Sequence, residues 1–231
     1  MNQAEADAQA RKGYDEMAEA YTNHVGLEMT VPSLGRSLLE AFAGRVQQQG
    51  PGAVADVGCG PGHVTAHLHE FGLDIFGVDN SPVLLDTAQA DHPHIRFEFG
   101  QLASLPVETG SLQAIISKHS LIHTPADLVP AALDDFGRAL TPGGLLYLSF
   151  FGSESPAAHG ASFDHAVTTA YAFDIDAMAE WLSAAGFTED VRVVQQPKEG
   201  ERKLPHGVFF ARREAAAPVP GSPSSPPRRR S

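Results

Sequence analysis

The chain has 231 residues, 42% of them apolar, which is enough for one domain with a full hydrophobic core. Sixteen basic residues stand against 28 acidic ones, and the net charge of −12 argues against a nucleic-acid or anionic-membrane partner and for a small molecule. The single cysteine, Cys59, excludes an intrachain disulfide and fits a reducing cytoplasm. The polar, acidic N-terminus predicts no secretory signal, and no run approaches the roughly 18 apolar residues of a membrane span.

Alternating apolar patterns predict an α/β fold. Five short runs bounded by Gly, Pro, Asn or Asp are predicted strands: 53–57, 73–78, 95–99, 112–117 and 145–150. The stretches with helical spacing between or before them are 33–49, 63–70, 82–90 and 126–140. Strict alternation predicts a doubly wound, mostly parallel sheet with helices on both faces. Two last runs, 191–196 and 207–212, predict a closing antiparallel hairpin and bring the sheet to seven strands.

The domain organisation follows from the same patterns. Residues 1–213 are predicted to form one domain, with no internal repeat. Within it, residues 151–173 make a connection longer than usual, which we expect to cover the substrate side. Residues 214–231 are rich in Pro, Ser and Arg and predict a disordered tail.

Three glycines with a spacing of two follow the first predicted strand directly. Gly58, Gly60 and Gly62 let a ligand approach the backbone closely while helix N–H groups point at it. The dinucleotide fingerprint fails because His63 stands at its sixth position, and no G-K-[ST] follows for a Walker loop. Asp79 ends the second strand, where a carboxylate accepts the hydroxyls of a ribose. The pattern favours an adenosine without a pyrophosphate over a ligand-free turn.

Two segments, DVGCGPG (56–62) and GVDNSP (77–82), resemble the nucleotide-binding half of class I S-adenosylmethionine-dependent methyltransferases. The stretches that agree in order and spacing are FEFGQLASLP, AIISKHSLIHTP, RALTPGGLLYLSF, WLSAAGFTEDVRVV and GVFFARR. The resemblance covers roughly residues 14–213. It is closest to a bacterial, actinomycete-like group acting in small-molecule or natural-product metabolism. It implies a Rossmann-like fold and S-adenosylmethionine as cofactor.

The resemblance also implies a set of cofactor contacts. The residues it places around S-adenosylmethionine are Tyr14, Asp56, Gly58, Gly60, Gly62, Asp79, Asn80, Ser81, Gln101, Leu102 and Ser117. Gln101 stands at the adenine position, where the family usually has an acidic residue; its carbonyl can still accept from the adenine amino group. Residues 1–50, with YDEMAEAY from Tyr14 to Tyr21, resemble a helical lid. Tyr14 would contact the cofactor and Tyr21 the substrate, unless both simply pack against the sheet.

Eleven histidines raise the question of metal or acid–base chemistry. The pairs 63/67 and 119/123 have the spacing of metal ligands on a helix, but a metalloprotease-type glutamate and a third ligand are missing, so no metal is predicted. His123 lies beyond the fourth strand, where an imidazole could take a proton from the nucleophile, with His119 as the second choice. The alternative is that His123 only shapes its loop. His165 and Tyr171, within residues 151–173, are predicted substrate contacts.

These observations predict methyl transfer from S-adenosylmethionine to an oxygen or nitrogen, or a carbon, of a small molecule, with S-adenosylhomocysteine as product. Two alternatives stay open: a cyclase or decarboxylase that uses the bound cofactor without transferring its methyl, and a pure binding module. A nicotinamide-dependent reductase is disfavoured by His63 and by the lack of a Tyr-x-x-x-Lys pair. The sequence does not predict the oligomeric state.

Overall fold

The computed structural model of the protein describes residues 1–153, 159–197, 200 and 203–215. The predicted C-terminal tail therefore lies, from residue 216 on, outside the described residues. That residues 1–213 form one domain stays a prediction.

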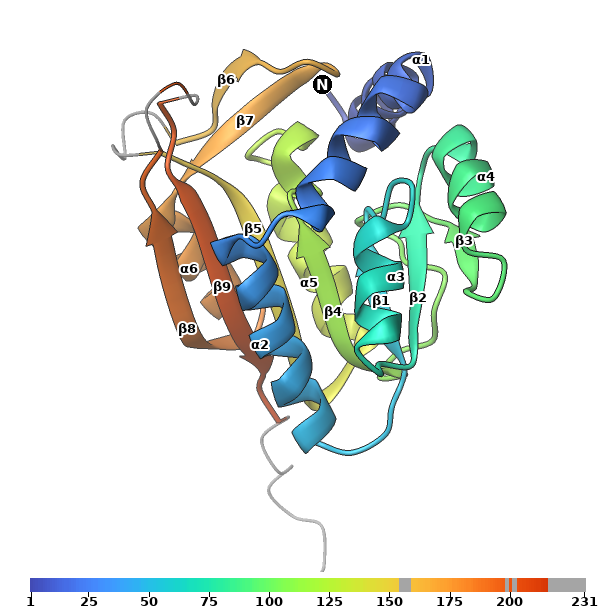
Figure 1. Ribbon diagram of the computed structural model, residues 1–231. Helices are drawn as coiled ribbons and strands as arrows, with labels where there is room; N and C mark the ends of the chain where they lie inside the picture. The colour runs from blue at the N-terminus through green and yellow to red at the C-terminus, as the bar shows by residue number, and fades with distance from the viewer. Residues whose placement is uncertain (154–158, 198–199, 201–202, 216–231) are drawn as a thin grey trace, which may run out of the picture.

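A twisted sheet runs through the centre of the molecule (Figure 1). Its strands are β1 (Val54–Val57), β2 (Ile75–Asp79), β3 (Phe97–Phe99), β4 (Leu112–Lys118), β5 (Leu140–Ser153), β6 (Ala161–Asp164), β7 (Thr169–Asp174), β8 (Phe187–Gln195) and β9 (His206–Arg213). Strands β3, β2, β1, β4 and β5 are parallel neighbours in that order. Strand β9 pairs antiparallel with β5 and with β8. The doubly wound α/β fold with its closing antiparallel hairpin is thus confirmed.

Helices cover both faces of the sheet and one of its edges (Figure 1). They are α1 (Gln3–Thr30), α2 (Leu34–Gln48), α3 (His63–Glu70), α4 (Pro82–Asp91), the 3-10 turn η1 (Leu121–His123), α5 (Val129–Ala139) and α6 (Ile175–Ala184). Buried side chains of α2 and α3 form one apolar cluster with the sheet, and those of α5 and α6 form another. Helices of the described residues are all too short or too polar to cross a bilayer.

Helix α1 crosses the edge of the sheet where the parallel strands end (Figure 1). It begins with a capping box, in which Asn2 and Glu5 each accept the other's backbone N–H. The helix has no broad apolar stripe, and among its described side chains only the small Ala6 belongs to the buried core. Contacts to α3 and α4 at the carboxyl edge of the sheet, rather than a core of its own, therefore hold this helix in place.

The predicted connection 151–173 differs from expectation. Strand β5 continues to Ser153, and β6 and β7 form an antiparallel hairpin whose β7 pairs parallel with the end of β5. Within the described residues the sheet therefore has nine strands instead of the predicted seven. Strand β7 reads TAYAFD, and its single β-branched residue, Thr169, makes a weaker strand pattern than the apolar runs at 53–57 or 112–117. Residues 154–158 lie outside the described residues.

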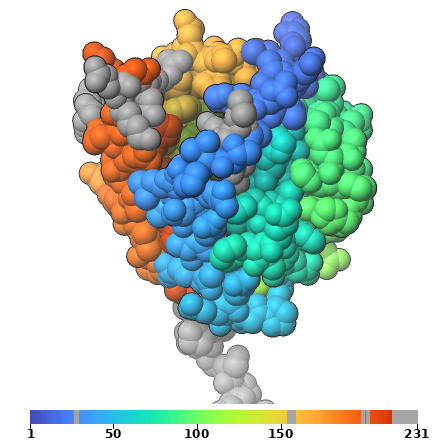
Figure 2. All heavy atoms as spheres, in the orientation of Figure 1, coloured from blue at the N-terminus to red at the C-terminus, as the bar shows by residue number. Residues whose placement is uncertain are grey.

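The β6–β7 hairpin reaches α1 across the top of the molecule, where the two lie side by side in Figure 2. Gln9 Nε2 donates to Thr168 Oγ1 at 3.2 Å. A Cβ added to Gly13 would come within 2.7 Å of the Val167 carbonyl oxygen, so only glycine permits this approach. Helix and hairpin together roof the carboxyl edge of the sheet.

Candidate active site

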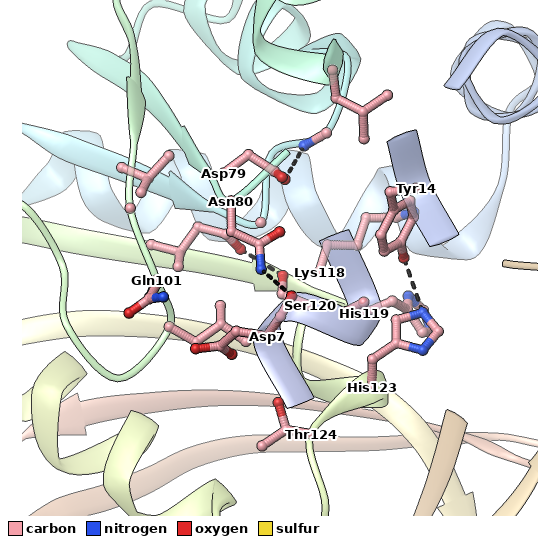
Figure 3. Close-up of a pocket in the computed structure, with 18 of the residues that line it drawn as sticks. Asp7, Tyr14, Asp79, Asn80, Gln101, Lys118, His119, Ser120, His123 and Thr124 are labelled. Atoms are coloured by element: carbon pink, nitrogen blue, oxygen red, sulfur yellow. Dashed lines mark hydrogen bonds between the residues drawn. The ribbon is translucent and has the colours of Figure 1, made fainter. Parts of the chain in front are cut away.

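Two adjoining cavities lie under this roof. The first is lined by α1, by the ends of β1, β2 and β4 with the segments that follow them, by the segment after β3, and by one residue of α4 (Figure 3). Its residues are Ala6, Asp7, Ala10, Tyr14, Tyr21, Val57, Gly58, Gly60, Val78, Asp79, Asn80, Leu84, Gly100, Gln101, Leu102, Lys118, His119, Ser120, His123 and Thr124. Ligands of open α/β sheets bind at this edge. The structure thus brings ten of the predicted site residues to one cavity.

The glycine loop and Asp79 form one unit. Gly58 and Gly60 have φ of +74° and +53°, which L side chains rarely adopt. Asp79 accepts the N–H of Gly60 through Oδ2 at 2.8 Å and that of Ser81 through Oδ1 at 2.9 Å. A Cβ at Gly60 would lie 3.3 Å from Tyr21 Cε1, so it would intrude into the cavity that both residues line. The loop is therefore shaped for a ligand that passes close to its backbone.

The Asp79 carboxylate is buried, with 9% of its surface exposed. Burial raises its pKa, while the amides of Ser81 and Gly60 oppose this rise by bonding to the charged form. Each carboxylate oxygen has a second lone pair beyond the one that the loop uses. Asp79 can therefore accept two neighbouring hydroxyl groups of a ligand without releasing the loop.

Asn80 and Gln101 lie at another part of the first cavity, together with Asp7 of α1 (Figure 3). Asn80 Nδ2 donates to the Asp7 carbonyl oxygen at 3.3 Å. Asp7 Oδ2 is buried and has no hydrogen-bond partner among the described residues, and burial raises the pKa of this carboxyl group. Asp7 lies in a helix without a motif, so nothing in the sequence pointed to it, yet it supplies an acceptor in the cavity.

Four predicted cofactor residues lie beside the first cavity without lining it: Asp56, Gly62, Ser81 and Ser117. The Asp56 carboxylate accepts from Thr65 Oγ1 at 2.6 Å, and burial raises its pKa to about 6. Gly62 is the N-cap of α3, and a Cβ there would lie 2.8 Å from the ring of Phe97. Ser81 caps α4, and Ser117 is fully buried in β4. Their positions support the loop and the sheet edge.

The second cavity has a volume of about 280 Å³. Its lining combines apolar side chains with histidines: Tyr14, Met17, Ala20, Tyr21, His24, Val25, Lys118, His119, Ile122, Phe151, His165, Ala166, Val167 and His206. His165, predicted as a substrate contact, is among them, whereas Tyr171 lines neither cavity and packs against the core. Tyr171 is half-buried in β7 between the buried Ala170 and Ala172, and its role as a substrate contact stays a prediction.

Four residues line both cavities: Tyr14, Tyr21, Lys118 and His119. The rings of Tyr14 and Tyr21 meet edge to face with centroids 4.9 Å apart. The two tyrosines lie two turns apart on α1, whereas Lys118 ends β4. The two cavities therefore adjoin at these four residues, which we call the shared wall.

His123 is buried behind Tyr14 (Figure 3). Its Nε2 lies 3.1 Å from Tyr14 Oη, and its Nδ1 lies 2.8 Å from the carbonyl oxygen of Thr169 in β7. Burial lowers the pKa of His123 to about 4, so the imidazole is neutral at pH 7. His123 lines the first cavity but not the second.

His119, the second predicted base, has φ of +54° and sits between Ser149 and His206. Its Nδ1 lies 3.3 Å from Ser149 Oγ and its Nε2 lies 3.1 Å from His206 Nδ1. Burial lowers its pKa well below the usual value. Elsewhere, His63 contacts the Thr22 carbonyl and His67 contacts Glu40. Nowhere in the described ranges do three or more His, Cys, Asp or Glu residues gather as metal ligands would.

Comparison with known proteins agrees with this geometry. Residues 54–144 match the model of a methyltransferase domain family. The chain is similar to a malonyl-[acyl-carrier protein] O-methyltransferase of Erwinia billingiae, with 30% identity over 62% of this chain and 54% of the relative. It is also similar to an uncharacterized methyltransferase of Mycobacterium tuberculosis, with 33% identity over 41% of this chain and 38% of the relative. The chain spans between about a quarter and about half the length of the curated relatives it matches first.

Among solved structures, the chain is similar to Burkholderia thailandensis 1,6-didemethyltoxoflavin-N1-methyltransferase, which was crystallised with 1,6-didemethyltoxoflavin and S-adenosylhomocysteine. The TM-score is 0.69 and the identity 23%, over 93% of this chain and 92% of that one. This likeness shows a shared fold. The family match covers the glycine loop and strands β1 to β4, and it identifies this part of the chain as a methyltransferase domain.

Proposed function

We propose that this protein transfers a methyl group from S-adenosylmethionine to an oxygen or nitrogen, or a carbon, of a small molecule, and releases S-adenosylhomocysteine. One observation carries the proposal. Two cavities of different character meet at Tyr14, Tyr21, Lys118 and His119, so that two bound molecules would be in contact there. Holding two reactants together in line is what methyl transfer chiefly requires of an enzyme.

The residues of the first cavity fit S-adenosylmethionine. The space that a Cβ of Gly60 would fill and the free lone pairs of Asp79 suit a ribose and its neighbouring chain. Gln101 and Leu102, with the Asp7 carboxyl group, offer acceptors and an apolar surface for the adenine. When bound, this cofactor supplies an electrophilic methyl group on a sulfonium centre.

The small size of the first cavity supports the proposal that α1 acts as a lid. Its volume is about 60 Å³, whereas pockets for ligands of drug size have about 300–1,000 Å³. Ala6 and Ala10 of α1 form part of its wall. We therefore expect α1 to move away from the sheet edge when the cofactor enters and to close over it afterwards.

The second cavity suits a small acceptor. Its apolar walls, with Ile122, Phe151 and Val167, bury a ring-sized molecule, and the histidines around them supply hydrogen bonds. Tyr21 and His165 line it, which supports their prediction as substrate contacts. One of the similar proteins named above is an O-methyltransferase and another is an N1-methyltransferase, which favours oxygen or nitrogen as acceptor atom. We place the reaction in cytoplasmic small-molecule or natural-product metabolism, which the single cysteine suits.

Two measurements test the proposal. Titration calorimetry with S-adenosylmethionine and with S-adenosylhomocysteine should show one site with micromolar affinity. Incubation with a panel of phenols, arylamines and carboxylic acids should yield S-adenosylhomocysteine and a product heavier by one methylene unit. No affinity for either ligand would refute the cofactor assignment. A transformed acceptor of unchanged or lower mass, with the cofactor intact, would instead favour a cyclase or decarboxylase.

A further inference from the structure

Tyr14 occupies a special place, because it lines both cavities and also contacts His123. The His123 ring is held at both nitrogens, by the Tyr14 hydroxyl at 3.1 Å and by the Thr169 carbonyl at 2.8 Å (Figure 3). The ring centroids of Tyr14 and His123 are 5.4 Å apart at an interplanar angle of 82°. Tyr14, His123 and Thr169 are thus joined in series, from the residues that line both cavities to the β6–β7 hairpin.

The partners of His123 decide where its proton lies. A carbonyl oxygen only accepts hydrogen bonds, so Nδ1, which faces Thr169, must carry the hydrogen. In the neutral imidazole, Nε2 then has only a lone pair. The Tyr14 hydroxyl must therefore donate to Nε2. The one basic nitrogen of His123 is thus covered by Tyr14 and does not face a ligand directly.

An acceptor in the second cavity can consequently reach Tyr14 but not His123. Burial raises the pKa of the Tyr14 hydroxyl well above its usual value, with smaller contributions from Tyr21 and Asp79. Tyr14 therefore keeps its proton in the resting protein. It can give up that proton only while it receives another, which is the behaviour of the middle member of a relay.

Building on the methyl transfer proposed above, we propose that Tyr14 and His123 form a proton relay for the acceptor. The O–H or N–H bond of the acceptor breaks, its electron pair stays on the oxygen or nitrogen for the new bond to carbon, and its proton moves to Tyr14 Oη. The proton that Oη carried moves to His123 Nε2. The resulting imidazolium keeps its Nδ1–H on the Thr169 carbonyl and later releases a proton to water. In this relay Tyr14 is the catalytic residue, and His123 acts through it.

Nuclear magnetic resonance of the full chain, labelled with ¹⁵N-histidine, tests the arrangement without any acceptor. The wild-type spectrum should show the Nδ1–H tautomer of His123. Tyr14→Phe removes the hydrogen bond that stabilises neutral imidazole, so the Nε2 signal should shift and the pKa of His123 should rise by about one. Tyr147→Phe, the control at a buried tyrosine that lines neither cavity, should leave the tautomer of His123 unchanged. An Nε2–H tautomer, or a His123 signal indifferent to Tyr14→Phe, would overturn the relay.

Kinetics provide the second readout, with whichever panel acceptor turns over. Tyr14→Phe and His123→Gln should each lower kcat about 10²-fold or more. Because the two residues act as one relay, kcat of the double variant should be within about threefold of kcat of either single variant. In the wild type, kcat should fall at acidic pH as His123 becomes protonated, and this decrease should be absent from both single variants. A wild-type protein that binds S-adenosylhomocysteine and transfers methyl groups, while Tyr14→Phe retains full kcat, would refute the relay alone. If S-adenosylhomocysteine does not bind, the proposed function is refuted instead. The tautomer of His123 would then still show whether the hydrogen bonds of the relay are present.

Discussion

The amide of Gly60 donates a 2.8 Å hydrogen bond to the carboxylate of Asp79, which ties the tip of the loop after β1 to the end of β2. The same carboxylate accepts the N–H of Ser81 and faces the first cavity. One side chain thus fixes the shape of the glycine loop and presents acceptors to a ligand. The cofactor site should therefore depend on this carboxylate more than on any apolar contact around it.

Asp79→Asn should weaken the binding of S-adenosylhomocysteine by about 10- to 100-fold, because a hydrogen bond to a charged group contributes about 1.5–3 kcal/mol. The matched control is Asp174→Asn. Asp174 is equally buried, at 9% exposure, and accepts two backbone amides at the start of α6, but it lines neither cavity. Calorimetry on both variants makes the comparison. Equal affinities for the two variants would show that Asp79 does not contact the ligand.

The approach of Gly58 to Ser120 predicts a steric effect on stability. A Cβ at Gly58 would lie 2.6 Å from the Cβ and Oγ of Ser120, at a φ of +74°. Gly143 has a similar φ of +81°, but no atom lies within 4 Å of its added Cβ. Gly143→Ala should therefore cost only the left-handed strain of about 1–2 kcal/mol, and Gly58→Ala distinctly more. Thermal unfolding measures both changes.

A double variant separates the two causes at Gly58. Adding Ser120→Gly removes the clashing side chain but leaves the backbone conformation as it is. Gly58→Ala combined with Ser120→Gly should then be destabilised relative to Ser120→Gly alone by about as much as Gly143→Ala is relative to the wild type. A larger residual loss would mean that the glycine loop itself deforms.

The core of the fold was predictable because hydrophobic periodicity reports it directly. The helix predicted at 63–70 is observed at His63–Glu70, and the strand predicted at 53–57 is observed at Val54–Val57. The glycine spacing likewise located the loop, since positive φ there requires that residue type. Local sequence determines these features, so one sequence is enough to find them.

The remaining site residues depend on contacts that are distant in the sequence. Thr169, which fixes the tautomer of His123, is 46 positions away from it and belongs to a strand with a weak signal. At the end of β4, Ser117 points into the interior and Lys118 lines both cavities. A shift of one residue exchanges the two faces of a strand, and the sequence alone does not decide between them. Asp7 and Ala10 reach the cavity only because α1 crosses the sheet edge.

The position of α1 leads to a prediction about cofactor entry. Ala10 lines the first cavity, whereas Ala8 is exposed on the same helix. Ala10→Phe should fill the space beneath the lid and weaken S-adenosylhomocysteine binding at least tenfold, because the larger ring occupies ligand volume. Ala8→Phe introduces the same side chain outside the cavity and should bind like the wild type. Equal affinities, measured by calorimetry, would mean that α1 does not lie over the bound cofactor.

Burial of His123 predicts how stability depends on pH. Its pKa falls from the ordinary 6.5 to about 4 in the folded protein, because burial disfavours the imidazolium. Between these values the unfolded chain binds more protons than the folded one, so the stabilisation from neutral His123 is complete above pH 6.5 and is lost as the pH falls toward 4. The loss should reach about 2 kcal/mol at pH 5 and about 3 kcal/mol at pH 4.

Denaturant unfolding of the wild type and of His123→Gln, at pH 7.5 and at pH 5, isolates this contribution. Asp56 and Asp79, whose pKa values burial raises, change stability in the opposite direction over part of this range, but both are present in the two proteins and cancel in the difference. His165, whose ring centroid lies 5.2 Å from that of His123, is common to both as well. The stability advantage of the wild type over His123→Gln should shrink by about 2 kcal/mol on acidification. An advantage that stays constant would mean that His123 titrates in the folded protein as it does in water, and that it is not enclosed between Tyr14 and Thr169.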